Sequence, residues 1–235
     1  GDWSSDVCSS DRLLTDLPRP PLHQTLPHFH DSPRYLALLR HAADADIFGR
    51  AASARPELDF TFENEAIVHM LAGLPPDALP QRVVHNDTKI DNVLFDAVSG
   101  EALCVLDLDT VMPGSVLYDF GDLVRSAASA SGEDERDLSR VYLRLPIFEG
   151  LVQGYSDALG TLLTARERDL LASAGKLVAF EVGIRFLSDY LQGDVYFKTR
   201  SAQQNLARAR NQFKLVRSMQ EQEPEMSAVV SRICG

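Results

Sequence analysis

The stretch of sequence that decides the fold is VVHNDTKIDNVLFD, residues 83–96. Its two ends are rich in β-branched and other apolar residues, whereas its centre is polar. A turn of small and polar residues follows over 96–100, and a third apolar run follows over 102–106. Short apolar runs bounded by turn residues are typical of strands. We therefore predict short strands at 82–85, 92–95 and 102–106, with polar loops at their edges.

The polar centre of this stretch has the spacing H-x-D-x-K-x-x-N, made by His85, Asp87, Lys89 and Asn92. A carboxylate on a tight loop, such as Asp87, can accept a proton from a bound hydroxyl. Asp107 opens a second acidic cluster directly after the third predicted strand. With Asn92 it offers oxygen ligands of the kind that Mg²⁺ shares with substrate phosphates. Since Lys89 can neutralise charge on a moving phosphoryl group, the combination indicates phosphoryl-transfer chemistry.

The alternative is that these residues only shape loops, because Asn, Asp and Thr are common turn formers. Asp96 and Ser99 fit that alternative. A turn does not require four such residues to be paired with the ends of strands, which favours a functional site for His85, Asp87, Asn92 and Asp107. For Lys89 alone, the alternative is a solvated surface lysine.

Three segments resemble the aminoglycoside phosphotransferase and choline kinase superfamily: VVHNDTKIDNVLFD at 83–96, VLDLDTVMPGSVLYDFGD at 105–122, and EVGIRFLSDYLQGDVYF at 181–197. Within it, the strings HNDTK and DLDTVMPG are most similar to bacterial N-acetylhexosamine 1-kinases. The resemblance covers most of residues 25–220. It implies an α+β fold, a protein-kinase-like C-terminal lobe that is mostly helical, with a small β-hairpin element carrying the catalytic loops.

The resemblance also implies roles for the matching positions around the loop. Asp87 is expected to be the catalytic base and to touch the acceptor hydroxyl. Asn92 and Asp107 are expected to bind Mg²⁺ and, with Lys89, the phosphates of ATP. His85 is expected to hold the loop by hydrogen bonds, in support of the catalytic group. Asp119 is expected to be a structural support that receives hydrogen bonds from the catalytic loop.

Other matching positions are expected to contact the acceptor. Asp109 is either a second metal-site or sugar-contacting carboxylate, or a structural residue. Arg185, Asp189 and Tyr196 lie in the segment that contributes to the sugar pocket of these kinases. The alternative for Arg185 is a surface charge, although its apolar neighbours weaken that interpretation.

Periodicity and capping patterns predict the helices. Pro33 and Pro146 each fit the first turn of a helix, and Thr164 with Glu167 forms a capping box. The predicted helices run over 32–49, 61–71, 118–130, 146–159, 164–191 and 206–219. The acidic stretch 133–137 is predicted to be a solvated loop or first turn, and the chain is expected to fray after Pro224.

The chain divides into four expected parts. Residues 1–12 read as a non-native scar, because this polar run has no helical or strand period. Residues 13–31 are a loop or linker, and 32–222 form the kinase-like lobe, followed by a flexible tail over 223–235. The three histidines of the linker, His23, His28 and His30, are interpreted as solvated imidazoles rather than metal ligands, since they lack the spacing of a metal site.

A kinase of this type needs an N-terminal lobe with a Gly-rich loop and a strand lysine. No Gly-rich loop precedes His85, and Lys89 is the first lysine in the chain. We therefore expect the N-terminal β lobe of the same protein to be missing from this chain. The isolated chain is then expected to have little or no activity and to expose an apolar face where that lobe docks.

Composition narrows the classes of partner. The net charge of −11 argues against nucleic acid or an anionic membrane surface, and no apolar run is long enough to span a bilayer. The three cysteines, Cys8, Cys104 and Cys234, form neither a disulfide framework nor a metal motif, which favours the cytoplasm. Cys104 is expected inside a strand, in the core.

The leading hypothesis is an ATP- and Mg²⁺-dependent kinase that phosphorylates the anomeric hydroxyl of an N-acetylhexosamine or a similar sugar. A second hypothesis keeps the chemistry but changes the acceptor to an aminoglycoside, choline, ethanolamine or homoserine. A third, from another class, is a non-catalytic pseudokinase or binding module. A eukaryotic-type protein kinase is disfavoured, because Asp107 opens D-L-D rather than D-F-G and no A-P-E segment follows.

Overall fold

The computed structural model describes Arg12, residues 22–75 and residues 77–235. The expected scar at 1–12, apart from Arg12, and residues 13–21 of the expected linker lie outside the described residues. The helices are α2 (Ser32–Ala45), α3 (Arg55–Glu63), α4 (His69–Ala72), α5 (Val116–Ala127), α6 (Leu145–Leu159), α7 (Ala165–Leu191), α8 (Gln204–Glu221) and α9 (Glu223–Cys234). The strands are β1 (Arg82–Val84), β2 (Val93–Phe95), β3 (Ala102–Val105) and β4 (Met112–Gly114).

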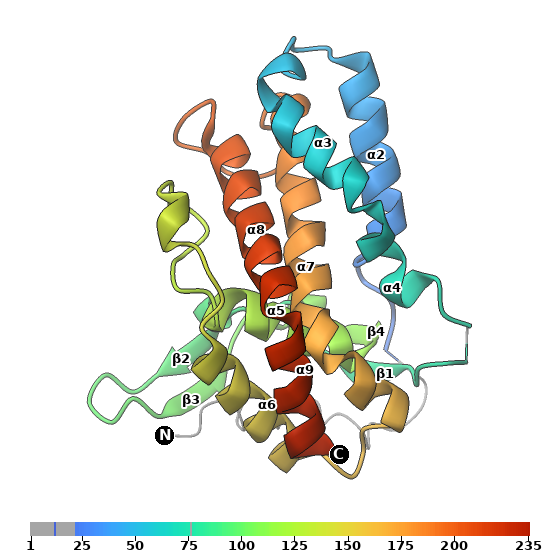
Figure 1. Ribbon diagram of the computed structural model, residues 1–235, viewed down its shortest axis with the longest axis vertical. Helices are drawn as coiled ribbons and strands as arrows, with labels where there is room; N and C mark the ends of the chain where they lie inside the picture. The colour runs from blue at the N-terminus through green and yellow to red at the C-terminus, as the bar shows by residue number, and fades with distance from the viewer. Residues whose placement is uncertain (1–11, 13–21, 76) are drawn as a thin grey trace.

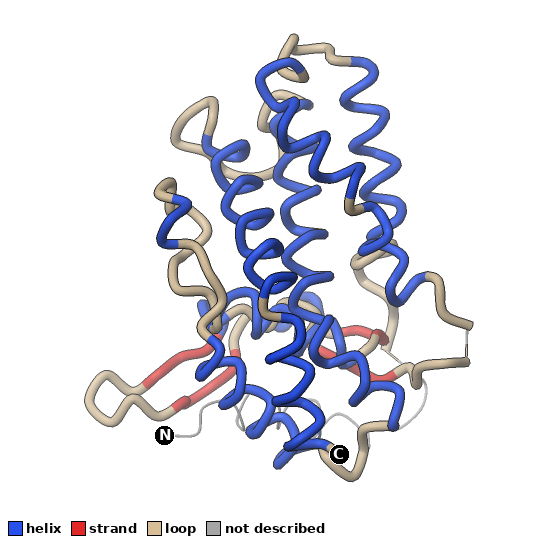
Figure 2. Tube along the Cα trace, in the orientation of Figure 1, coloured by secondary structure: helices blue, strands red, loops and turns tan. Residues whose placement is uncertain are grey.

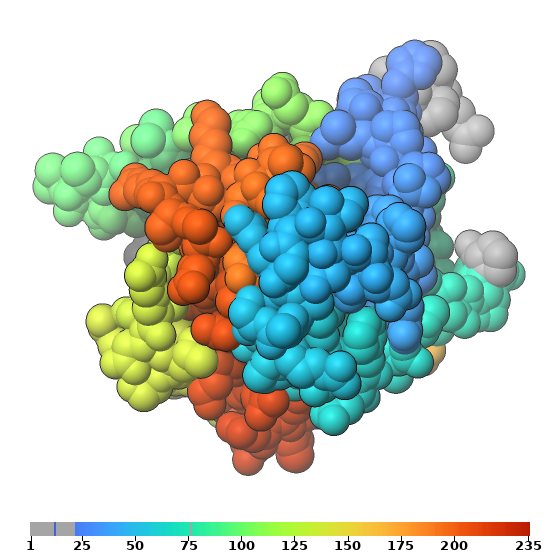
Figure 3. Space-filling view, turned by 90° about the horizontal axis from the view of Figure 1, so that it is seen from above, coloured from blue at the N-terminus to red at the C-terminus, as the bar shows by residue number. Residues whose placement is uncertain are grey.

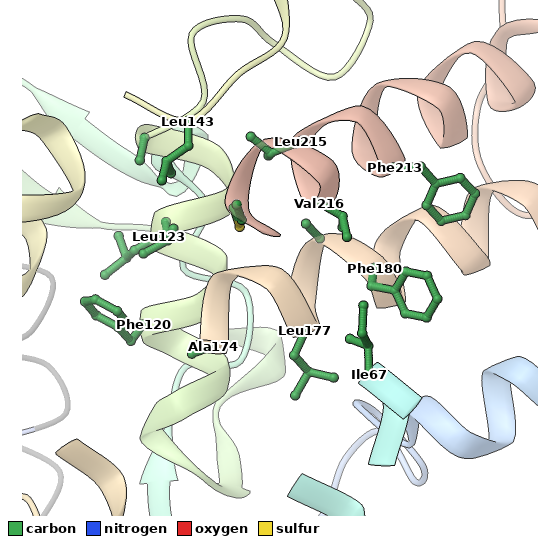
Figure 4. Close-up of a cluster of buried hydrophobic side chains, with 14 of the residues drawn as sticks. Ile67, Phe120, Leu123, Leu143, Ala174, Leu177, Phe180, Phe213, Leu215 and Val216 are labelled. Atoms are coloured by element: carbon green, nitrogen blue, oxygen red, sulfur yellow. The ribbon is translucent and has the colours of Figure 1, made fainter. Parts of the chain in front are cut away.

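Helix α7 forms the axis of the molecule (Figure 1). Helices α8, α5 and α2 pack against it, and α9 packs on α6 and α7. Aromatic side chains from three helices fill the space beside α7: Phe60 lies 5.1 Å from Phe213 and 6.2 Å from Phe180, ring centre to ring centre. Figure 4 shows Phe180 and Phe213 at one end of this core and Phe120 with Leu123 at the other. The core therefore runs along α7 and under α5, the helix that lies nearest to β1.

The start of α7 contacts strand β1 through a largely buried ion pair. Thr164 and Glu167 make the predicted capping box, in which each side chain accepts from the other residue's backbone N–H. The buried carboxylate of Glu167 also receives the guanidinium of Arg82, at 3.0 and 3.2 Å. Because a buried charge is stable only when it is paired, this contact fixes β1 against the end of α7.

The strands form two separate two-stranded antiparallel sheets. β2 pairs with β3 as the expected hairpin, with Val93 opposite Val105. β1 pairs with β4, with Val84 opposite Met112, and β4 was not predicted. The first acidic loop thus connects β1 to β2 and the second connects β3 to β4, so both loops run between the same two sheets. Helices account for most of the described residues (Figure 2), so the fold is α+β with a mostly helical lobe, as the sequence predicted.

The β2–β3 hairpin projects from the helical body (Figures 1 and 3). It carries exposed apolar side chains, including Leu94, Leu103 and Val98, which is 97% exposed. Cys104 is also exposed, so its expected place in the core is wrong. The prediction failed because side chains alternate along a strand: Val93 and its partner Val105 face the core, whereas Cys104 lies opposite Leu94 on the uncovered face.

The first two predicted helices differ most from their predicted bounds. The first ends at Ala45 instead of Gly49, because Asp46 adopts the left-handed conformation that terminates it. Asp31 supplies the N-cap of this helix. The helix predicted over 61–71 is α3, which starts earlier because Pro56 opens its first turn. Beyond Asn64 the chain continues as a 3-10 turn and the short α4.

The expected frayed tail is wrong for residues 223–234, which form α9. Pro224 lies in the first turn of this helix, a position where proline starts a helix instead of ending one. Met226, Val229 and Val230 are buried, so the helix has an apolar face packed on α6 and α7. None of the described helices is long and apolar enough to cross a membrane.

Candidate active site

The loop between β1 and β2 is held from beneath by one buried carboxylate. Asp119, at the start of α5, accepts the backbone N–H of His85 at 2.7 Å and that of Asn86 at 2.6 Å. Thr88 Oγ1 donates to the backbone carbonyl of Asp119 at 2.6 Å. Hydrogen bonds to a charged acceptor are stronger than neutral ones, and a helix N-terminus favours a negative charge. Asp119 therefore joins the loop firmly to α5, with the hydrogen bonds expected from the sequence.

His85 joins the two acidic loops. Its ring is buried, Nδ1 accepts the N–H of Asp87 at 3.3 Å, and Nε2 lies 2.9 Å from the carbonyl of Leu106. Because Nδ1 accepts, the proton must be on Nε2, and that proton is donated to Leu106. His85 thus connects the residue before Asp107 to the peptide of Asp87.

Asp87 has one occupied and one available carboxylate oxygen. Its Oδ2 receives the ammonium of Lys89 at 2.7 Å and the amide Nδ2 of Asn92 at 2.9 Å. The side chain keeps a quarter of its surface exposed. The two donors orient the carboxylate, which leaves Oδ1 as the atom that can accept a proton from a bound hydroxyl.

The Lys89 ammonium lies among several carboxylates. Burial lowers its pKa, but the hydrogen bond to Asp87 and the charges of Asp87, Asp122 and Asp107 raise the pKa above its ordinary value. Lys89 is therefore a fixed positive charge beside Asp87, and the alternative of a freely solvated lysine does not describe it.

Asn92 and Asp107 lie at the same end of the β2–β3 hairpin. The backbone N–H of Leu106 donates to the carbonyl of Asn92 at 2.8 Å, which places Asp107 one residue from this bond. Asn92 turns its amide hydrogens to Asp87, so its side-chain oxygen is left as a ligand atom. Asp107 is exposed and adopts a left-handed backbone conformation, with φ of 61°.

This donor set fits Mg²⁺ bound together with phosphates. One carboxylate and one amide oxygen are the hard ligands that this ion takes while keeping waters and phosphate oxygens. Among the described residues, no group of three or more His, Cys, Asp and Glu side chains gathers to hold a metal by itself. An ion held here would therefore depend on phosphate ligands from a nucleotide.

Residues 12–162, more than half of the chain, match the family model described as the phosphotransferase enzyme family. The chain belongs to this family. The match includes the whole catalytic loop, the hairpin and Asp119. A phosphotransferase of this family transfers a phosphoryl group to a small molecule, and the carboxylates, the ammonium group and the amide oxygen gathered here are groups that such a transfer can use. Arg185, Asp189 and Tyr196 lie beyond the matched segment.

The predicted acceptor residues of this phosphotransferase form a second group, at a cavity of about 300 Å³ between α2 and α7. The Arg185 guanidinium lies within 6 Å of the ring centres of four aromatic residues, Phe29, Tyr35, Tyr196 and Phe197. Among the described residues it makes no ion pair shorter than 4 Å, so the positive charge faces the cavity without a carboxylate partner. Arg185 is half-buried and not a simple surface charge.

Asp189 borders the same cavity but its oxygens are occupied. Oδ1 accepts the backbone N–H groups of Val195 and Tyr196 at 2.9 and 2.8 Å. Oδ2 accepts the N–H of Phe197 at 3.0 Å and the amide of Asn205 at 2.8 Å. With four donors satisfied, this carboxylate shapes the segment that presents Tyr196, which is 71% exposed at the rim.

Asp109 lies in the second acidic loop, two residues after Asp107. Its residue is exposed, and its backbone carbonyl accepts the hydroxyl of Thr25 at 3.2 Å. The structure thus brings together His85, Asp87, Lys89, Asn92, Asp107 and Asp119 around one loop. It places Arg185, Asp189 and Tyr196 at the neighbouring cavity.

The interpretation of the linker histidines is wrong for His30. His28 is exposed, but His30 is buried, with Nδ1 2.9 Å from Glu181 and Nε2 3.0 Å from the carbonyl of Asn86. The partners are 151 and 56 residues away in sequence, so no local pattern could indicate them.

A buried ion pair under the catalytic loop was also missed. Asp122 and Arg125 lie one turn apart on α5, 2.7 Å from each other and both 5% exposed. Their i, i+3 spacing is visible in the sequence, although it is more typical of a surface pair. Ser126, on the same helix, accepts the backbone N–H of Ile90 at 3.0 Å. Helix α5 therefore supports the loop at both of its ends.

Proposed function

We propose that this phosphotransferase is an ATP- and Mg²⁺-dependent kinase that phosphorylates the anomeric hydroxyl of an N-acetylhexosamine or a similar sugar. The observation that carries the proposal is the arrangement around Asp87. One oxygen is fixed by Lys89 and Asn92 and the other is available, directly beside the hairpin end that carries Asp107.

The chain's own residues account for the positioning and the proton transfer. Asp87 orients the acceptor hydroxyl and takes its proton as the oxygen attacks the γ-phosphoryl group of ATP, while the bond to the β-phosphate breaks and ADP leaves. Lys89 offsets the negative charge near the reacting groups. Asn92 and Asp107 would hold the ion, which when bound neutralises phosphate charge.

The charge of the cavity supports a neutral or anionic acceptor. Arg185 places a positive charge among aromatic rings at this cavity, and this charge would repel a cationic acceptor. This disfavours choline, ethanolamine and aminoglycosides relative to a sugar. Aromatic side chains also suit the flat apolar faces of a sugar ring.

The exposed apolar side chains of the β2–β3 hairpin support a further part of the proposal. Leu94 and Leu103 of the hairpin are each about half exposed or more, and so is Leu108 in the acidic loop that follows it. Several large exposed apolar side chains on neighbouring segments are typical of a binding face. We propose that the nucleotide and a nucleotide-binding lobe cover it, and that the isolated residues 13–235 turn over little or not at all. Turnover at the rate of typical kinases would contradict that part alone.

The test is phosphoryl transfer by the natural full-length protein, with the product identified by ³¹P NMR. A sugar 1-phosphate from an N-acetylhexosamine supports the proposal, whereas products from choline, homoserine or an aminoglycoside alone select the other acceptor class. Nucleotide binding that does not depend on Mg²⁺, without any product, supports the pseudokinase alternative.

The matched variants are Asp87→Asn and Asp91→Asn. Asp91 is an exposed carboxylate four residues away in the same segment. Loss of a general base lowers kcat by about 10²–10⁴-fold, so Asp87→Asn should fall by that factor while Asp91→Asn stays near the parent value. A near-normal kcat for Asp87→Asn would refute the role of Asp87.

A further inference from the structure

His30 lies where four separate parts of the chain meet. Its ring stacks on Tyr118 of α5 at 4.2 Å between ring centres, with 6° between the planes. Its two nitrogens reach Glu181 in the middle of α7 and the carbonyl of Asn86 in the catalytic loop. Ser32, at the start of α2, donates to the other oxygen of Glu181. The ring is thus the centre of a buried polar network.

The hydrogen-bond partners of His30 determine which of its two ring nitrogens carry protons. A backbone carbonyl has no proton to give, so Nε2 must donate to Asn86. Glu181 is fully buried and accepts the Ser32 hydroxyl, and as a carboxylate it also requires a donor at Nδ1. Both nitrogens then carry protons and the ring is an imidazolium. The alternative is a neutral ring that accepts a proton from a protonated Glu181.

The surrounding charges favour the ion pair. Burial lowers the pKa of His30, but the charge and hydrogen bond of Glu181, the Asn86 carbonyl and the charge of Asp122 raise the pKa above its ordinary value. Burial raises the pKa of Glu181, but His30, Ser32 and the charge of Arg185 hold the pKa below its usual range. Tyr118, also stacked on the ring, stays neutral because its pKa is raised by burial and by the charges of Glu181 and Asp31.

We propose that His30 is a positioning residue of the catalytic loop, a buried imidazolium that fixes the peptide between Asn86 and Asp87. The carbonyl of Asn86 and the N–H of Asp87 belong to one rigid peptide plane. His30 holds the carbonyl at 3.0 Å, and His85 holds the N–H at 3.3 Å on the opposite side. Rotation of this plane, and with it the direction of Asp87, is therefore restricted from both sides.

The conformation of Asn86 shows why such restraint is needed. Its φ is 66°, in the left-handed region that residues other than glycine rarely adopt. The Asn86 N–H is held by Asp119 and its side chain donates to the carbonyl of Thr110 at 3.0 Å. Without His30 the carbonyl of Asn86 would be the one polar backbone atom of this residue left without a described partner. An unsatisfied buried carbonyl would favour rotation of the plane.

The same network reaches the acceptor cavity. Phe29, the neighbour of His30, and Arg185, one turn after Glu181 on α7, both line that cavity. The role of His30 rests on the proposed function only in so far as Asp87 is the base. Its test is therefore chosen to read the ring and the loop directly, without an activity measurement.

The experiment is ¹H–¹⁵N NMR of the histidine rings and the loop amides in the full chain. The ring signals are assigned with His30→Gln, and His28→Gln serves as the matched control, since His28 is 57% exposed and two residues away. We expect His30 to carry protons on both nitrogens at neutral pH, and we expect His28→Gln to leave the His30 ring signals and the loop amides unchanged.

The variant Glu181→Gln tests whether the protonation of His30 affects the catalytic loop. Loss of the opposite charge should lower the His30 titration midpoint by about one to three pH units, and the amide signals of Asn86 and Asp87 should move with that midpoint. If this variant does not fold, the parent chain is titrated to alkaline pH until His30 loses its proton, and the same amides are followed.

Two results would overturn the proposal. One is a His30 ring with a single protonated nitrogen at neutral pH in the parent chain, which is the neutral-pair alternative. The other is deprotonation of His30 that leaves the Asp87 amide signal unchanged. Absence of kinase activity, by contrast, would remove the proposed function but leave these spectra as a description of the loop.

Discussion

Gly121 lies where α5 crosses α7, and a single methyl group there should loosen the support of the catalytic loop. A Cβ at this position would lie 2.6 Å from the backbone carbonyl oxygen of Ala174 and 2.6 Å from a methyl carbon of Val178. Real Cβ contacts are not that short, so Gly121→Ala must push the two helices apart. Asp119 is two residues away on α5 and would move with the helix.

The expected size of the effect is a balance of two terms. Overpacking a well-filled core costs about 1–3 kcal/mol, and the upper half of that range applies here because one of the two contacts is backbone, which cannot rotate away. Alanine is preferred to glycine in a helix by about 1 kcal/mol, which offsets part of the cost. We expect a net loss of about 1–2 kcal/mol in the free energy of unfolding.

Gly150→Ala is the matched control. Gly150 is an exposed glycine of α6, and a Cβ there meets nothing within 4 Å. Only the preference of a helix for alanine over glycine remains, so the free energy of unfolding of this variant should exceed that of the parent by about 0.5–1 kcal/mol. The two variants make the same chemical change with opposite expected signs.

Urea unfolding followed by far-ultraviolet circular dichroism measures both. The free energies of unfolding of the two variants should differ by about 1.5–3 kcal/mol, which is about 0.75–1.5 M in the urea midpoint for a slope near 2 kcal/mol per molar. Equal stabilities would show that α5 and α7 can separate without cost, and the close-packing argument for the loop's support would fail.

Two further predictions concern buried charges around the loop. Asp119→Asn replaces one of two acceptor oxygens by a donor that faces a backbone N–H, so the free energy of unfolding should fall by about 2–4 kcal/mol. In the control, the exposed Asp91→Asn should change the free energy of unfolding by less than about 0.5 kcal/mol. Similar values for the two variants in urea unfolding would contradict the role of Asp119. The stabilisation by the His30–Glu181 pair, measured as the difference in unfolding free energy between the parent and Glu181→Gln, should be full between about pH 4.3 and about pH 6.5. It should decrease as the pH rises through the raised pKa of His30 and as the pH falls through the lowered pKa of Glu181, and a difference that does not vary with pH would contradict an ion pair.

The elements that sequence predicted well are those with local causes. The capping box of Thr164 and Glu167 marks the start of α7, and Pro146 marks the first turn of α6. The hairpin of β2 and β3 follows from apolar runs around a turn. Each of these patterns depends on contacts between residues that are close in sequence, so the sequence alone is enough to predict it.

The failures came from contacts between distant segments. β4 is three residues long and contains Pro113, which no strand pattern would favour, and it exists because Val84 and Arg82 pair with it. A proline such as Pro224 can either start or end a helix. Here the chain continues as α9 because its apolar face packs on α6 and α7. Cys104 required knowledge of which face of the hairpin is covered.

The candidate site shows the same division more sharply. The residues that would meet the reacting groups, Asp87, Lys89 and Asn92, are close in sequence because one short loop must present them together. The groups that hold this loop in a strained conformation come from elsewhere: Asp119 from α5, and His30 with Glu181 from segments 151 residues apart. A loop with positive φ at Asn86 cannot hold itself, since its own residues offer too few partners. The residues for the chemistry can therefore be predicted from a sequence motif, whereas the rigidity of the loop depends on how the helices pack.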